Sequence, residues 1–148
     1  MKTIPVDRTR LVEALESCEN RVTYNLGAKV PLDAEPGAIK KIDCSGWARW
    51  LVHFITHGET TMPDGSQNQL AWCRESNFKL TEFGNCALTD GRLRICFMRA
   101  KPGGHGHVWL CINGRTIESY GGHGVGRRKW DTLKRSVCAT YVLTEPLS

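Results

Sequence analysis

The stretch Lys41-Ile42-Asp43-Cys44-Ser45-Gly46-Trp47, followed by a helical pattern that ends near Gly58, decides the expected fold. Hydrophobic residues recur there at the spacing of one buried helix face, at Trp47, Trp50, Leu51, Phe54 and Ile55. Asp43 stands where a helix cap is expected, so Cys44 falls in the first turn. Unpaired amides and the positive end of the helix dipole favour a thiolate at that place. The position makes Cys44 a candidate nucleophile, and a structural cysteine at a helix start is the alternative.

The rest of the chain changes from helical to β-rich patterns. Helices are expected over residues 7–18, capped by Asp7, and 67–77, with an irregular loop over 22–42. Four β-rich runs follow at 93–99, 108–112, 115–120 and 137–143, and the glycine-rich stretch 121–126 is expected to form a flexible rim. This order predicts an α+β fold, with N-terminal helices packed on a C-terminal antiparallel sheet, in a single domain spanning 1–148.

Asn113-Gly114 is a strong signal for a two-residue β-hairpin turn. The turn sets the register of its strands, so that Ile112 faces Arg115, Leu110 faces Ile117, Trp109 faces Glu118 and His107 faces Tyr120. His107 and Glu118 then become diagonal neighbours on one sheet face, roughly 7 Å apart. This geometry predicts that Glu118 orients the His107 imidazole as a general base.

Two other interpretations of these side chains are open. His105, His107, Glu118, His123 or Cys111 could bind a metal, but their spacing is loose, and we expect neither a metal nor a cofactor. His107 could also be structural.

The seven cysteines are an odd number and contain no Cys-x-x-Cys pair. This argues against a complete disulfide framework and against a zinc ribbon. Apart from Cys44, we expect the cysteines to be reduced packing residues.

Asp43-Cys44-Ser45-Gly46-Trp47 resembles the Asp-Cys-Ser-Gly signature of the NlpC-type cysteine peptidases, papain-like enzymes of bacteria and phages that cut peptidoglycan stem peptides. Tyr24-Asn25-Leu26-Gly27 resembles the Tyr-x-x-Gly of this family, which forms a wall of the substrate pocket. His107-Val108 and the strand after the turn resemble its His-Val block. The resemblance spans Tyr24 to Tyr120.

This resemblance implies a papain-like fold and a residue for each catalytic role. Cys44 would be the nucleophile, His107 the base and then the acid, and Glu118 the orienter, with His123 as the alternative third residue. The family more often has His, Asn or Gln at the third place, so Glu118 is a departure. Tyr24, Asp43 and Ser45 match substrate-pocket positions of the family. We also expect three further residues to bind substrate, namely Trp109, Arg115 and His123.

The charge is unevenly distributed along the chain. Residues 1–90 carry 10 basic and 12 acidic side chains, whereas residues 91–148 carry 10 basic and 3 acidic. A basic C-terminal half fits an anionic partner, which could be nucleic acid, an anionic polymer or a carboxylate-bearing substrate, or it could be a solvated basic face. If the substrate is the carboxylate-rich stem peptide that the resemblance implies, residues near the hairpin could bind it, namely Arg115, Arg127, Arg128 and Lys129. The resemblance implies a peptidoglycan hydrolase that cleaves the bond between D-glutamate, through its γ-carboxyl, and the diamino acid.

The expected setting follows from the N-terminus and from the absence of long apolar stretches. Residues 1–10 lack the apolar core of a signal peptide, and no stretch is long enough to span a membrane. We expect cytoplasmic synthesis and action on the periplasmic wall after delivery by a phage or a secretion system. The partners would be the stem peptide and a delivery machinery or an immunity protein, for a monomer that binds neither nucleic acid nor membrane.

Two alternative functions remain at this point. One is a papain-like acyltransferase, or an amide or ester hydrolase, that acts on a non-wall substrate. The other is a non-enzymatic binding module on a decayed fold.

Overall fold

A computed structural model describes residues 1–81, 88–100, 102, 106–130 and 137–147 of the chain. Its α-helices are α1 (Arg8–Cys18), α2 (Cys44–Ile55) and α3 (Ser66–Glu75), and a short 3-10 helix, η1, covers Pro36–Ala38. Within these described ranges, none of the helices has the length and apolar character needed to cross a membrane.

The helices pack against one six-stranded sheet. The order of its strands is β3-β8-β4-β5-β6-β7, and each neighbouring pair is antiparallel. The strands are β3 (Lys79–Thr81), β4 (Arg94–Met98), β5 (His107–Ile112), β6 (Arg115–Tyr120), β7 (Gly124–Gly126) and β8 (Val137–Val142). A separate parallel pair joins β1 (Thr23–Tyr24) to β2 (Lys41–Ile42), just before α2.

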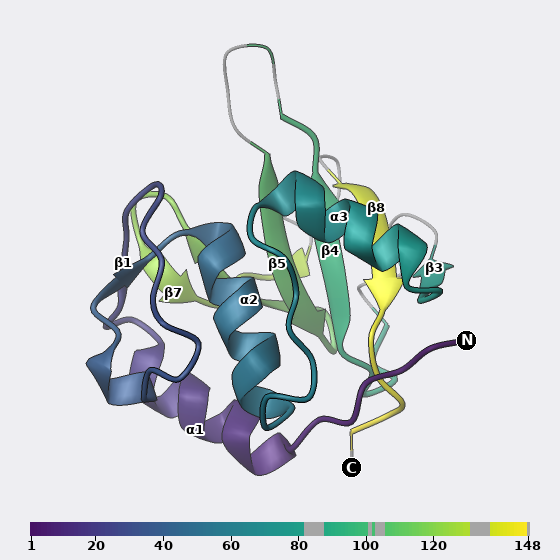
Figure 1. The fold of residues 1–148 in the computed structure, drawn as a ribbon, viewed down its shortest axis with the longest axis horizontal. Coiled ribbons are helices and arrows are strands. Elements are labelled where there is room, and N and C mark those ends of the chain that lie inside the picture. The colour runs from purple at the N-terminus through teal and green to yellow at the C-terminus, as the bar shows by residue number, and fades with distance from the viewer. Residues whose placement is uncertain (82–87, 101, 103–105, 131–136, 148) are drawn as a thin grey trace.

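Buried side chains form two clusters of different size around the sheet. Figure 1 shows α2 beside β5, with α1 below it and α3 in front of β4 and β8. The main core contains buried side chains of α1, α2 and the sheet, among them Trp47, Leu51, Val108 and Leu110. A smaller cluster consists of Cys96, Trp109, Cys111, Trp130 and Val137. Because side chains alternate between the faces of a strand, Trp109 lies on the side of β5 opposite to Val108 and Leu110.

The expected α+β arrangement is confirmed, and so are its main elements. The Asp7 side chain caps α1 by accepting hydrogen bonds from the Thr9 and Arg10 amides. The hairpin has the predicted register, with Ile112 opposite Arg115 and Leu110 opposite Ile117. Both turn residues have positive φ, 50° at Asn113 and 78° at Gly114, as the predicted two-residue turn requires.

Three expectations need correction. The stretch 22–42 contains β1, η1 and β2, and is therefore not wholly irregular. The stretch 121–126 ends in strand β7, whose three residues are all buried, so it is not a flexible rim. Cys111 is disulfide-bonded, whereas we expected a reduced packing residue. An odd cysteine count excludes complete pairing, but it does not exclude a single bridge. Cys86, which was also expected to be reduced, lies outside the described residues.

Gly124 allows the edge strand β7 to contact the segment that precedes β1. The Val125 amide donates to the Val22 carbonyl at 3.0 Å, and the Asn20 amide donates to the Val125 carbonyl at 2.9 Å. A Cβ at Gly124 would lie 2.0 Å from the Val22 oxygen, and the φ of Gly124 is +96°. Glycine is needed there because both the space and the backbone angle exclude other side chains.

We predict that Gly124→Ala destabilises the protein by about 3 kcal/mol, because a methyl group would clash with backbone and the backbone angle would be strained. Urea unfolding followed by far-UV circular dichroism measures this difference.

Gly121→Ala is the matched control, since nothing lies within 4 Å of its Cβ position and its φ is not positive. The control should stay within about 0.5 kcal/mol of the wild type. Equal stabilities of the two variants would contradict the prediction.

Candidate active site

Cys44 is the first residue of α2, and Asp43 fixes that helix start. The Asp43 side chain accepts a hydrogen bond from the Gly46 amide at 2.7 Å, as a helix cap does. Cys44 is only 8% exposed, and it lines a cavity of about 410 Å³ that also borders Tyr24 and Gly65. The nucleophile expected from the sequence is therefore accessible from a pocket.

Gly46 has no side chain, and this lets the Asp43 carboxylate approach the start of α2 closely. A Cβ at this position would lie 2.8 Å from Asp43 Oδ1 and 3.1 Å from the Ala28 carbonyl oxygen. Any larger residue would push the capping carboxylate away from the helix start. The glycine of the Asp-Cys-Ser-Gly stretch therefore has a steric role here.

His107 lies between Cys44 and Glu118. Its Nε2 is 2.8 Å from Glu118 Oε1, and its side chain also forms a hydrogen bond with the Cys44 thiol. An ionised carboxylate can only accept hydrogen bonds, so Nε2 carries the proton. Nδ1 is then the nitrogen left for Cys44. The structure thus brings together the three side chains that the sequence assigned to catalysis.

Glu118 is completely buried and has a second charged partner. Arg128 Nε donates to Glu118 Oε2 at 2.9 Å, and Arg128 Nη2 donates to Oε1 at 2.7 Å. The Arg128 guanidinium also stacks on the Tyr120 ring, 4.0 Å from its centre. This two-point pairing fixes the plane of the carboxylate and balances its charge.

The proton equilibria of this array favour an ion pair. Burial disfavours the charged imidazolium, but hydrogen bonds to Cys44 and Glu118 outweigh it and raise the pKa of His107 to about 9. Burial also opposes ionisation of Cys44, yet the His107 contact lowers the pKa of this thiol below its ordinary value. Despite burial, hydrogen bonds from His107 and Arg128 lower the pKa of Glu118 to about 2.

Three buried thiols elsewhere in the described residues have pKa values that shift in the opposite direction. Burial raises the pKa of Cys73 and of Cys96 to about 12, and it also raises the pKa of Cys18. Cys44 is the described cysteine whose pKa is lowered, which distinguishes it from these packing residues.

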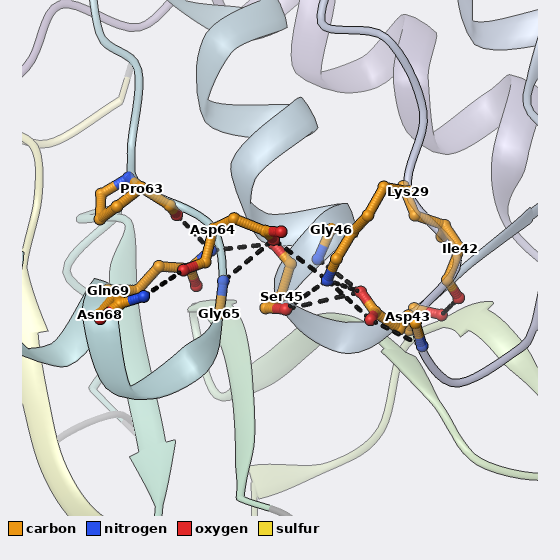
Figure 2. A network of polar contacts seen from close by, with 12 residues as sticks. Lys29, Ile42, Asp43, Ser45, Gly46, Pro63, Asp64, Gly65, Asn68 and Gln69 are labelled. Atoms are coloured by element: carbon orange, nitrogen blue, oxygen red, sulfur yellow. Dashed lines mark hydrogen bonds and ion pairs between the residues drawn. The ribbon is translucent and has the colours of Figure 1, made fainter.

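Lys29 is an unexpected member of the site (Figure 2). Its ammonium lies 2.7 Å from both Oδ atoms of Asp43, 2.8 Å from Ser45 Oγ and 3.1 Å from Asp64 Oδ1. Hydrogen bonds to Asp43 and Asp64 outweigh burial and raise the pKa of Lys29. The ammonium therefore stays charged and links the start of α2 to the loop before α3.

Three of the residues expected to bind substrate line the pocket. Tyr24, Asp43 and Ser45 border the same cavity as Cys44. Burial is the main cause of the raised pKa of Tyr24, and the proximity of Cys44 and Asp43 adds to it.

The other three lie elsewhere. Trp109 is fully buried and stacks on the His107 ring, with 5.4 Å between ring centres. It therefore supports the imidazole and does not face the substrate. Arg115 is exposed beside the hairpin turn, at the end of β6 remote from His107, roughly 17 Å along the strand. His123 Nε2 lies 2.8 Å from Asn20 Oδ1, while Glu118 occupies the place next to His107.

The alternative metal site gains no support from this geometry. Within the described part of the chain, no three His, Cys, Asp or Glu side chains form a group suited to a metal ion. Cys111 is disulfide-bonded, and His105 lies outside the described residues.

Sequence reasoning missed Lys29, and it placed Arg128 among the residues that could bind an anionic substrate without finding its pairing with Glu118. Lys29 comes from the loop between β1 and β2, whose path no local pattern predicts. A signal for the role of Arg128 lay in Glu118, because a buried carboxylate beside one histidine needs a second cationic partner.

Comparisons with known proteins support the fold. The P60 domain of the antigen MAP1204 from Mycobacterium avium subspecies paratuberculosis has a crystal structure that is similar to this one. The two match with a TM-score of 0.55 at 16% identity, over 95% of each chain. No family model matches the sequence, and no curated protein matches it either. The chain thus has the papain-like α+β fold of a P60 domain.

Proposed function

We propose that this protein is a cysteine peptidase that hydrolyses amide bonds in peptidoglycan stem peptides, with the γ-D-glutamyl bond to the diamino acid as its target. The observation that carries the proposal is the Cys44–His107–Glu118 array, which opens into a pocket. The likeness to a P60 domain supports the choice of fold. The choice of substrate rests on the resemblance of Asp43-Cys44-Ser45-Gly46 to the signature of the NlpC-type peptidases.

The first half of the mechanism forms a thioester. The Cys44 thiolate attacks the scissile carbonyl carbon, and the developing oxyanion accepts a hydrogen bond from the Cys44 amide. That amide belongs to the first helical turn, whose N–H groups have no partner within the helix. Protonated His107 then gives its proton to the leaving amine as the carbon–nitrogen bond breaks.

The second half releases the acid. Neutral His107 takes a proton from water, and the resulting hydroxide attacks the thioester carbon. The carbon–sulfur bond breaks, the carboxylic acid leaves, and the thiolate and imidazolium are restored. This step needs a neutral imidazole, so an imidazolium that is too stable would slow it.

Arg128 limits how strongly Glu118 stabilises the His107 imidazolium. A lone buried Glu118 carboxylate would hold the proton on His107 strongly, because nothing would offset its charge. The bidentate guanidinium neutralises the carboxylate while leaving Oε1 available to orient Nε2. Arg128 thus acts as a positioning residue that makes Glu118 behave more like a neutral acceptor.

A second candidate function is a hydrolase or transferase that acts on acyl groups. A second cavity of about 420 Å³ adjoins the first and shares Ser66, Gln67, Ala100 and Gly106 with it. Its apolar lining includes Leu70, Phe97 and Met98, which would suit an acyl chain better than a carboxylate-rich peptide.

We predict that Cys44→Ala lowers the turnover of purified stem peptide at least about a thousand-fold, because it removes the nucleophile. Mass analysis of muropeptide digests measures this and also locates the cleaved bond. Far-UV circular dichroism should show an unchanged fold. Retained cleavage by the variant would contradict the mechanism, and exclusive consumption of an acyl ester would favour the second candidate.

We predict that iodoacetamide labels Cys44 at pH 7 well before Cys73 or Cys96. The pKa of Cys44 is lowered, whereas the pKa values of the other two are about 12, so their thiolate fractions at pH 7 differ greatly. Labelling should fall as the pH drops through the pKa of Cys44. Peptide mass spectrometry gives the site and the rate. A Cys44 that reacts only in alkaline solution would contradict the ion pair.

We predict that Arg128→Met raises the pKa of His107 above its value of about 9, because the variant removes a neighbouring cation. Glu118→Gln should lower that pKa, because it removes the carboxylate. The double variant should fall between the two. NMR titration of labelled histidine measures all three variants without a substrate. An unchanged pKa in Arg128→Met would show that Arg128 is only structural.

A further inference from the structure

Two neighbouring strands of the sheet separate beside the nucleophile. Strands β5 and β6 are paired through residues 110–112 and 115–117, next to the hairpin turn. Both strands continue, to His107 and to Tyr120, but within the described residues their ladder ends where these paired ranges end. From residue 118 onward, β6 pairs with β7 along its opposite edge. The start of β5 and the end of β6 therefore border a break in the ladder.

The backbone amide of Val108 is directed toward this break. In a hairpin with a two-residue turn, every second residue back from the turn points its N–H and C=O groups at the partner strand. Ile112 and Leu110 are in this phase, and so is Val108, whose partner would be Ser119 if the register continued. With the strands apart, the Val108 amide donates a hydrogen bond to the Cys44 sulfur. The nucleophile is thus the acceptor for an amide that β6 does not pair.

Ser119 holds the segment of chain that leads to Cys44. Its hydroxyl donates to the Ile42 carbonyl oxygen at 2.9 Å, and both residues are fully buried. Ile42 ends β2 and lies two residues before Cys44. A buried carbonyl oxygen needs a donor, and this donor fixes the plane of the peptide group that enters the helix start. Val108 and Ser119, which would face each other in a continuous ladder, therefore both contact the segment 42–44.

We propose that Ser119 is a positioning residue for the nucleophile: by holding Ile42 in the break between β5 and β6, it keeps the Cys44 sulfur within reach of the Val108 amide. This amide does not titrate, so it stabilises a negative sulfur whether His107 is charged or neutral. It also acts when the thioester breaks, because the carbon–sulfur bond then releases a thiolate. The inference rests on the proposed function only for the role of Cys44, and it holds for any substrate.

The Asp43 cap alone does not fix this geometry. The cap sets where α2 begins, through the Gly46 amide, but it does not set the distance between that helix start and β5. Ser119 and Val108 lie on the two strands of one hairpin. A contact with Ser119 therefore places the segment before Cys44 relative to the Val108 amide.

The test measures how the alkylation of Cys44 by iodoacetamide depends on pH, and it needs no substrate. We expect Ser119→Ala to raise the midpoint of this profile by about one pH unit, because the thiolate loses a hydrogen bond and such bonds to charged groups contribute about that much. Below the midpoint, labelling should be roughly ten-fold slower. Peptide mass spectrometry gives the rate at each pH. An unchanged midpoint in folded Ser119→Ala protein overturns the inference.

Thr56→Val is the matched control. Thr56 is buried at the C-cap of α2, roughly 18 Å along the helix from Cys44, and its hydroxyl donates to the Val52 carbonyl at 2.7 Å. The variant removes the same kind of hydrogen bond from the other end of the same helix. Urea unfolding should therefore show a loss of stability similar to that of Ser119→Ala, while the Cys44 midpoint stays at its wild-type value. Equal midpoint shifts in the two variants would mean that Ser119 only stabilises the fold, and would overturn the inference.

A backbone variant tests the Val108 amide itself. Replacing Val108 by the α-hydroxy acid with the same side chain turns the amide into an ester and removes its N–H, which points away from β4. This variant should raise the midpoint by a similar amount. Adding Ser119→Ala should then shift it little further, because both changes remove the same contact. Additive shifts overturn the inference, and so does an unchanged midpoint in the ester protein, which decides the question if Ser119→Ala does not fold.

Failure of the inference and failure of the proposed function give different profiles. A wild-type midpoint in the alkaline range would contradict the thiolate nucleophile, and the proposed function would fail together with the inference. A low wild-type midpoint that Ser119→Ala leaves in place would overturn the inference alone, and the peptidase proposal would stand.

Discussion

The capping of α2 by Asp43 is the interaction on which the site depends. One carboxylate fixes where the helix begins, through the Gly46 amide, and where the preceding loop runs, through the Gly27 amide and Lys29. The contact with the Gly46 amide positions Cys44, and the contacts with the Gly27 amide and Lys29 shape the pocket wall. Because one carboxylate serves both, the position of the nucleophile and the lining of its pocket cannot change independently.

Charge in the array is balanced in successive pairs. The Cys44 thiolate faces the His107 imidazolium, the imidazolium faces Glu118, and Glu118 faces Arg128. Two anions and two cations alternate, so each buried charge has a neighbour of opposite sign that offsets its desolvation cost. A neutral amide as the third residue would need no fourth partner. The choice of glutamate therefore explains why an arginine from the segment after β7 takes part.

Features that depend on neighbouring residues could be predicted from the sequence, and features that depend on distant ones could not. The Asn113-Gly114 turn fixed the hairpin register and hence the His107–Glu118 contact, while Asp43 marked the start of α2. Lys29 reaches the site through a loop without periodicity. Trp109 is buried in a cluster with Trp130 and with Val137 of β8, which both come from far along the chain. Strand alternation alone made the face of β5 that carries Trp109 appear open to substrate.

The position of β8 between β3 and β4 has a consequence for how the protein is made. Strands β4, β5 and β6 pair with sequence neighbours and can assemble early, whereas β8 completes the sheet only after residue 142 has been synthesised. Residues 137–142 must therefore leave the ribosome before β8 can join β3 to β4. Until then the surface of β4 that pairs with β8 is an unpaired edge. The pairing of β8 with β3 and β4 is thus a late step in the folding of this sheet, because it joins strands that lie far apart in the sequence.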